Sequence, residues 1–145
     1  MKKRSWILGS MLAVSMILGA CNSEEADSSK TSEPSGDKPY VAIVSKGFQH
    51  QFWQAVKKGA EDAAEEFDVE ITFEGPESES QVDKQIEMLR AVLDKKPDAL
   101  GFAALDSQAA TPLLEEAQKS EIPIIAFDSG VESDIPLATA STDNK

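Results

Sequence analysis

The sequence has few of the residues on which many protein sites depend. Its 145 residues include one cysteine, Cys21, and one histidine, His50. A single cysteine excludes an intrachain disulfide and any metal site built from several cysteines. No group of histidine, cysteine and carboxylate residues has the spacing of metal ligands either. We therefore expect a protein without a metal or a cofactor.

Common catalytic motifs are also missing. The chain has no Gly-rich loop of the P-loop or dinucleotide-binding type. Ser129 follows Asp128 directly, but the Gly-x-Ser-x-Gly motif of the α/β hydrolases does not surround it. We expect that the protein is not an enzyme, and a hydrolase-like enzyme is the weakest of the alternatives.

Basic residues are scarce, with 14 Lys and Arg against 26 Asp and Glu, and the formal net charge is −12. A negative field of this size repels phosphate backbones, so we expect no nucleic acid partner. It also opposes adhesion to an anionic lipid surface. The simplest interpretation of the charge is a soluble, exported surface.

The N-terminal apolar run is too short for a comfortable membrane span. Basic residues at positions 2–4 precede this run, Trp6–Leu18, which predicts a signal peptide over residues 1–20. The run ends in Leu18-Gly19-Ala20-Cys21, which resembles the lipobox of bacterial lipoproteins. The resemblance implies that Cys21 is lipidated and becomes the new N-terminus. An ordinary secretion signal with a chance cysteine, or a short N-terminal anchor, is the alternative.

Residues 21–38 are rich in Ser, Glu and Asp and contain almost no apolar side chains. Such a segment cannot bury a core, so we predict a disordered tether. The globular part is then 39–145, roughly the size of one small domain.

Apolar runs separated by helical patterns predict an α/β fold, a doubly wound parallel sheet with helices on both faces. The run Val41–Val44 is typical of a strand buried on both faces. Residues 70–74 alternate strictly between polar and apolar, which predicts an edge strand beside it. Further strands are expected at 99–103, 122–127 and, more weakly, 137–140, with helices at 52–67, at 80–95 and after the third strand. The connections diverge around the first strand and predict a crevice at its carboxyl end.

Two local features of the helices are also predicted. In the first helix, helical spacing places these residues on the inward face: Phe52, Val56, Ala60, Ala63 and Phe67. In the third helix, Pro112 is expected in the first turn, where a proline is tolerated, and Asp106 is expected as the helix cap.

Four features in this order resemble the periplasmic sugar-binding proteins of ABC importers, of the ribose- and arabinose-binding type. They are Phe52-Trp53 with Lys58-Gly59-Ala60, Pro97-Asp98-Ala99-Leu100 with Asp106-Ser107, Ile122–Asp128, and Ala140–Asn144. The resemblance implies a type I lobe of a periplasmic binding protein. It also implies that 39–145 is an N-terminal lobe truncated near the first hinge crossing, without the return segment that completes its sheet. A natural half-length protein is the alternative.

The family resemblance implies an extracytoplasmic solute-binding lipoprotein that captures a monosaccharide for an ABC importer. Its partners would be a sugar, an ABC permease and, through lipidated Cys21, the bacterial cell membrane, and it would be a monomer. The alternative is a sensor that passes a sugar signal to a membrane receptor.

The resemblance also implies which residues bind the ligand: Lys46, His50, Phe52, Trp53 and Asp128. Each has a simpler interpretation. Phe52 and Trp53 could be core residues, and Lys46 could be a solvated loop lysine. His50 could be a surface residue at the start of a helix, and Asp128 could cap a turn. Ser129 stands where ribose-binding relatives carry arginine, which argues against ribose.

Overall fold

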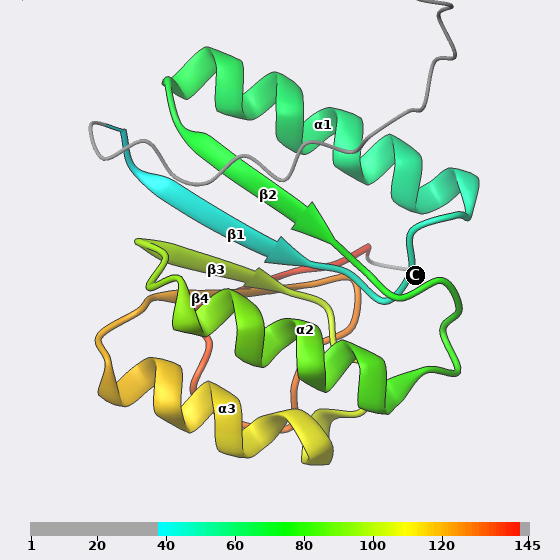
Figure 1. Cartoon of the computed structure of the whole chain (residues 1–145), viewed down its shortest axis with the longest axis vertical. Helices are drawn as coiled ribbons and strands as arrows, with labels where there is room; N and C mark the ends of the chain where they lie inside the picture. Colours follow the sequence, from blue (N-terminus) through cyan, green and yellow to red (C-terminus); the bar gives the residue numbers. More distant parts are fainter. Residues whose placement is uncertain (1–37, 143–145) are drawn as a thin grey trace, which may run out of the picture. The chain divides into compact units, whose positions relative to one another are not determined.

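The computed structural model describes residues 38–142 as a five-stranded sheet with three helices (Figure 1). The strands are β1 (Tyr40–Val44), β2 (Glu70–Glu74), β3 (Ala99–Phe102), β4 (Ile124–Phe127) and β5 (Ala138–Ala140). The helices are α1 (Gln51–Phe67), α2 (Val82–Asp94) and α3 (Ser107–Lys119). Each predicted element is present, with ends that differ by a few residues.

All strand pairs are parallel, and the strand order is β2-β1-β3-β4-β5. The predicted position of β2 at an edge beside β1, with β3 on the other side, is confirmed. The chain leaves β1 toward β2 and then returns to the opposite side of β1. The loops after the strands therefore diverge around the carboxyl end of β1, where open α/β sheets bind ligands.

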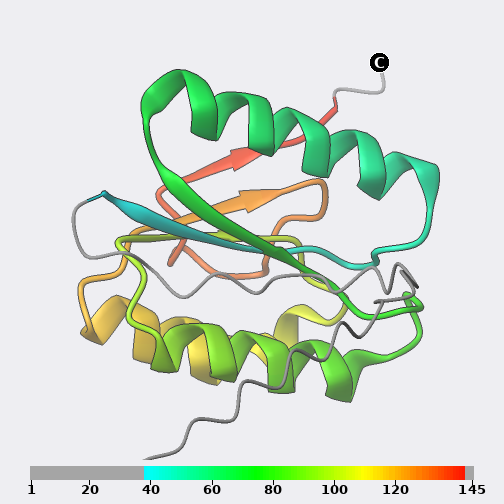
Figure 2. The ribbon, with the colours of Figure 1, turned by 45° about the horizontal axis from the view of Figure 1, so that its top comes forward.

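The helices cover both faces of the sheet, as expected. Figure 2 shows α1 on one face and α2 and α3 on the other. The main hydrophobic core lies on the side of α2 and α3. Its fully buried members come from strands and helices alike, and they include Ala42, Val44, Phe102, Leu89 and Leu114. This core holds the strand ends in fixed positions.

The predicted inward face of α1 was wrong at both ends, because Phe52 at its start and Ala63 and Phe67 toward its end are exposed. Trp53 is 2% exposed, whereas Phe52 is 47% exposed and Phe67 is 69% exposed. Val56 and Ala60 do face the sheet, as predicted. The inward face of α1 therefore begins at Trp53 rather than Phe52, because the position of the sheet decides which of two adjacent aromatic residues is buried.

Pro112 does not lie in the first turn of α3. The helix begins at Ser107, so Pro112 is inside it, where proline cannot donate the usual backbone hydrogen bond. The helix starts this early because the carboxylate of Asp106 accepts the backbone N–H of Ala109 at 2.9 Å. The predicted cap at Asp106 is confirmed.

An apolar groove of about 340 Å³ lies between α1 and the sheet. Strands β1, β3 and β4 form its floor, with Ile43, Gly101 and Phe127 among the lining residues. At its far side Ile125 is 39% exposed. Within 38–142, α1 is the only helix on this face; it lies mainly against β2, and Trp53 at its start also packs against Phe127 of β4.

Several expectations fall outside the described residues. They are the signal peptide over residues 1–20, the lipidated Cys21, almost all of the tether and the last residues, 143–145. Among the helices of the described part of the chain, none combines the length and the apolar character needed to cross a bilayer.

Candidate functional site

Lys46 and Asp128 meet at the carboxyl edge of the sheet. Lys46 follows β1 and Asp128 follows β4, and the Lys46 Nζ lies 2.6 Å from the Asp128 Oδ2. Lys46 also donates to the Ser129 Oγ at 2.7 Å. The two charged side chains are 19% and 30% exposed, so the ion pair is partly sheltered from solvent yet open to a ligand. The structure thus brings together two of the predicted site residues.

The backbone of Asp128 is in the left-handed region, with φ 58°. Asp is one of the few residues other than glycine that adopt this conformation at modest cost. The Asp128 N–H donates to the carbonyl of Ala140 at 2.9 Å, which ties the turn to the end of β5. The turn aims the carboxylate back across β3 toward Lys46. Strained backbone of this kind is often found at functional sites.

The two adjacent aromatic residues have different surroundings. Trp53 is buried, and its indole N–H donates to the Glu79 Oε1 at 2.9 Å. Its ring packs edge-on against Phe52 at 4.8 Å between centroids and against Phe127 at 6.3 Å. The Lys46 Nζ lies 5.9 Å from the Trp53 ring centroid. Phe52 is therefore the residue of this pair whose ring is open to solvent.

His50 is the N-cap of α1. Its Nδ1 accepts the backbone N–H of Phe52 at 3.2 Å, and the side chain is exposed. This geometry satisfies one of the free N–H groups at the start of the helix. The surface interpretation of His50 therefore accounts for its contacts, and its imidazole is held against the backbone of Phe52, two residues further along the chain.

A buried amide, which the sequence analysis missed, joins the loops of the site. Gln85 of α2 is completely buried and donates to the carbonyls of Ser45 at 2.8 Å and Ala103 at 2.9 Å. Its Oε1 accepts the N–H of Leu105 at 2.9 Å. These bonds fix the loop after β1 to the loop after β3. The sequence does hint at this role, because Gln85 is a polar residue on the face of the predicted helix that points inward.

The β2–α2 loop approaches the β1–α1 loop closely at Gly75. A Cβ built on Gly75 would lie 2.7 Å from the carbonyl oxygen of Gly47. The Ser45 Oγ donates to that same carbonyl at 2.6 Å and to the Glu74 carbonyl at 3.2 Å. A side chain at Gly75 would have to displace backbone, so the residue is needed for the close contact of the two loops.

The resulting edge combines charged hydrogen-bonding groups with an open aromatic ring. An ammonium donates to a ligand oxygen, a carboxylate accepts from a hydroxyl, and an aromatic ring packs against an apolar face. In the described residues no three His, Cys, Asp or Glu side chains gather in a way that could hold a metal ion. The groups at this edge can therefore donate hydrogen bonds to a ligand, accept them from it and pack against its apolar surface.

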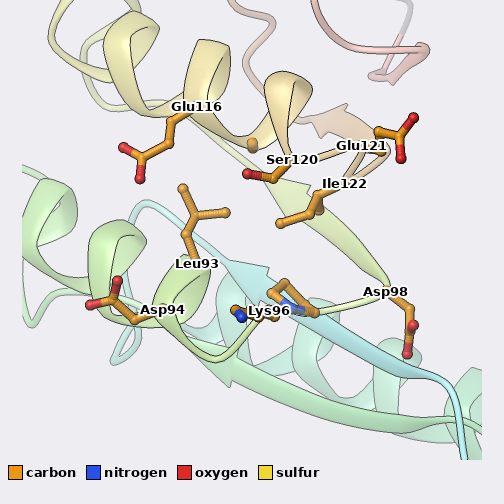
Figure 3. A pocket seen from close by; sticks show the side chains of 10 residues that line it. Leu93, Asp94, Lys96, Asp98, Glu116, Ser120, Glu121 and Ile122 are labelled. Carbon is orange, nitrogen blue, oxygen red and sulfur yellow. The ribbon is translucent and has the colours of Figure 1, made fainter.

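A cavity of about 620 Å³, larger than the apolar groove between α1 and the sheet, lies at the opposite edge of the sheet (Figure 3). It opens between the C-terminal ends of α2 and α3, and residues such as Leu93, Asp98, Glu116 and Ile122 line it. Asp98 is already engaged there, because its Oδ2 accepts the N–H of Tyr40 at 2.7 Å. This cavity lies at the amino ends of the strands, away from Lys46 and Asp128.

Comparison with known proteins identifies relatives with the same fold. Residues 41–145 match the family model described as the periplasmic binding protein domain. The chain is 27% identical over 122 residues to the D-ribose/D-allose-binding protein of Pseudomonas aeruginosa. That alignment covers 81% of this chain and 37% of the relative, so the chain spans about a third of that protein's length.

Several solved structures also have a fold similar to that of this chain. A protein described as an ABC transporter, LacI family transcriptional regulator, from Brachyspira murdochii is 46% identical, with a TM-score of 0.70 over 76% of this chain and 35% of that one. A carbohydrate transporter solute binding protein from Agrobacterium radiobacter, solved in complex with D-arabinose, is 31% identical, with a TM-score of 0.71 over 76% and 37% of the two chains. The parallel sheet, its strand order and the matched residues 41–145 together place this chain in the periplasmic binding protein domain family.

Proposed function

We propose that this chain is the sugar-binding N-terminal lobe of an extracytoplasmic solute-binding lipoprotein that serves an ABC importer. The observation that carries the proposal is the partly sheltered pair of Lys46 and Asp128, with the exposed ring of Phe52 linked to Lys46 through the contacts that both make with Trp53. A sugar hydroxyl can accept from the ammonium and donate to the carboxylate, while the ring face packs on an aromatic side chain. Relatives named for D-ribose, D-allose and D-arabinose support a monosaccharide as the ligand.

The proposed domain organisation is a signal peptide over 1–20, a tether over 21–38 and the lobe over 39–145. In two-lobed binders a ligand is enclosed by walls from both lobes, and contacts to each wall select the closed state. The share of each relative that this chain covers, about a third, supports its being one wall of such a site. Transfer of the ligand to a membrane receptor instead of a permease would use the same wall.

The first prediction tests the proposed binding surface of this lobe, the wall formed by Lys46, Phe52 and Asp128. We expect the chain to bind a monosaccharide no more tightly than about 1 mM, because a single lobe leaves most hydroxyls to water. Titration of the ¹⁵N-labelled protein with D-allose, D-ribose and D-arabinose should shift amide signals around Lys46, Phe52 and Asp128. Asp128→Asn should weaken binding about tenfold, because it removes the charge of a charge-assisted hydrogen bond. Asparagine is chosen because it tolerates the left-handed backbone at this position.

Asp106→Ala is the matched control, because Asp106 is an acidic residue at the same edge that caps α3. It should lower stability by about 1 kcal/mol and leave the shifts unchanged. Sugar-dependent shifts confined to the cavity between α2 and α3, or Asp128→Asn binding as well as wild type, would refute the proposed wall.

A further inference from the structure

We infer that Glu79 is a positioning residue of the sugar site, which acts by holding the Trp53 indole in place. This inference rests on the proposed function. Glu79 lies in the exposed loop between β2 and α2, and it reaches across to a side chain that follows β1. Its contact with Trp53 is a hydrogen bond of 2.9 Å from the indole N–H to the carboxylate.

The indole needs this partner because of where it lies. Trp53 is 2% exposed, and a buried N–H without an acceptor gives up its hydrogen bond to water without replacing it. The N–H points to the β2–α2 loop rather than into the core, and Glu79 supplies the acceptor there. A carboxylate accepts more strongly than a neutral group, so the bond fixes the ring plane as well as satisfying the donor.

The fixed ring in turn contacts the groups proposed to bind the ligand. Phe52 packs edge-on against it, with an angle of 77° between the ring planes. The Lys46 ammonium lies near its face, 5.9 Å from the centroid. Phe127, the last residue of β4 before Asp128, also packs edge-on against it. A rotation of the indole would therefore disturb two aromatic rings and the Lys46 end of the ion pair.

The backbone of Gly47 leaves the room for this arrangement. A Cβ built on Gly47 would lie 3.0 Å from the Trp53 Cδ1 and 3.5 Å from the Glu79 Cγ. The indole and the glutamate thus pack together against one stretch of backbone next to Lys46. The loop after β1, the loop after β2 and the first turn of α1 meet at this contact.

Intrinsic fluorescence tests the inference, because Trp6 and Trp53 are the only tryptophans. In a Trp6→Phe background, Glu79→Ala should shift the Trp53 emission to longer wavelength and increase its quenching by acrylamide. The same variant should weaken sugar binding about three- to tenfold in the NMR titration. Glu79→Gln keeps a side-chain acceptor and should restore both the emission and most of the affinity. Glu77→Ala, which removes a carboxylate from the same loop, should change neither.

An unchanged Trp53 emission in Glu79→Ala would overturn the inference, as would a changed emission with wild-type affinity. Failure of the glutamine variant to restore the emission would overturn it too. If the wild-type chain binds no sugar, the proposed function fails, and the emission of the three variants still decides whether Glu79 holds the indole.

Discussion

The side-chain amide of Gln85 uses both of its polar atoms in the interior, on three backbone groups of two loops. Gln85→Leu keeps a similar volume but leaves two carbonyls and one N–H without this partner. We expect a loss of about 2–4 kcal/mol in the free energy of unfolding. The measurement is the midpoint of urea denaturation at constant slope.

Gln118→Leu provides the comparison, since Gln118 is exposed on α3 and its replacement should change stability by less than about 0.5 kcal/mol. Equal midpoints for the two variants would show that the buried amide contributes no more than a surface glutamine does.

Single residues also show how far the structure could be predicted from the sequence. Helical spacing identified Val56 and Ala60 correctly, but it wrongly placed Phe52 rather than Trp53 on the inward face. Two adjacent aromatic residues fit helical faces that differ by one position, and only the position of the sheet decides between them. Asp106 was predictable because a cap depends on neighbours along the chain. The Lys46–Asp128 contact joins residues 82 positions apart (128 − 46), and its geometry depends on the left-handed turn at Asp128.

Among the elements, two glycines give opposite expectations for the same substitution. Gly59 lies within α1, and a Cβ built there meets no atom within 4 Å. Gly59→Ala should therefore stabilise the protein by about 0.5–1 kcal/mol, because alanine loses less backbone entropy in a helix. Gly75→Ala should destabilise it by about 1–3 kcal/mol, because the added methyl group meets the loop after β1.

Melting temperatures of the two variants, recorded together, test this pair. Stabilisation by Gly75→Ala would mean that the two loops separate easily, and the rigid edge described above would then be incorrect.

The order of the strands was predictable for a simple reason. The continuous apolar run of β1 indicates two covered faces, and the alternation in β2 indicates an edge. The partial exposure of β4 at Ile125 could not be predicted from the apolar pattern. Ile125 and Phe127 belong to an apolar run, and nothing in that run indicates how far α1 extends across the neighbouring strands.

For the whole molecule, we propose that Cys21 is the membrane anchor. In a bacterial host, the protein should incorporate labelled fatty acid and partition into the detergent phase, because one cysteine ends the lipobox-like Leu18-Gly19-Ala20-Cys21. Cys21→Ala should abolish both, whereas Ser23→Ala should change neither. Lipid labelling of the Cys21→Ala protein would exclude the proposed anchor.

The position of β1 between β2 and β3 also has a consequence for the order in which the sheet can form. β1 is made first, yet its two partners end at Glu74 and Phe102, each beyond an intervening helix. Parallel strands cannot pair through a short turn, so no two neighbouring strands of this sheet can join as soon as they are synthesised. One edge of β1 therefore stays open until β2 is complete, 30 residues later (74 − 44), and the other edge until β3 is complete, 58 residues later (102 − 44). Export in an unfolded state would postpone that wait until the chain has crossed the membrane, where pairing and burial then proceed together.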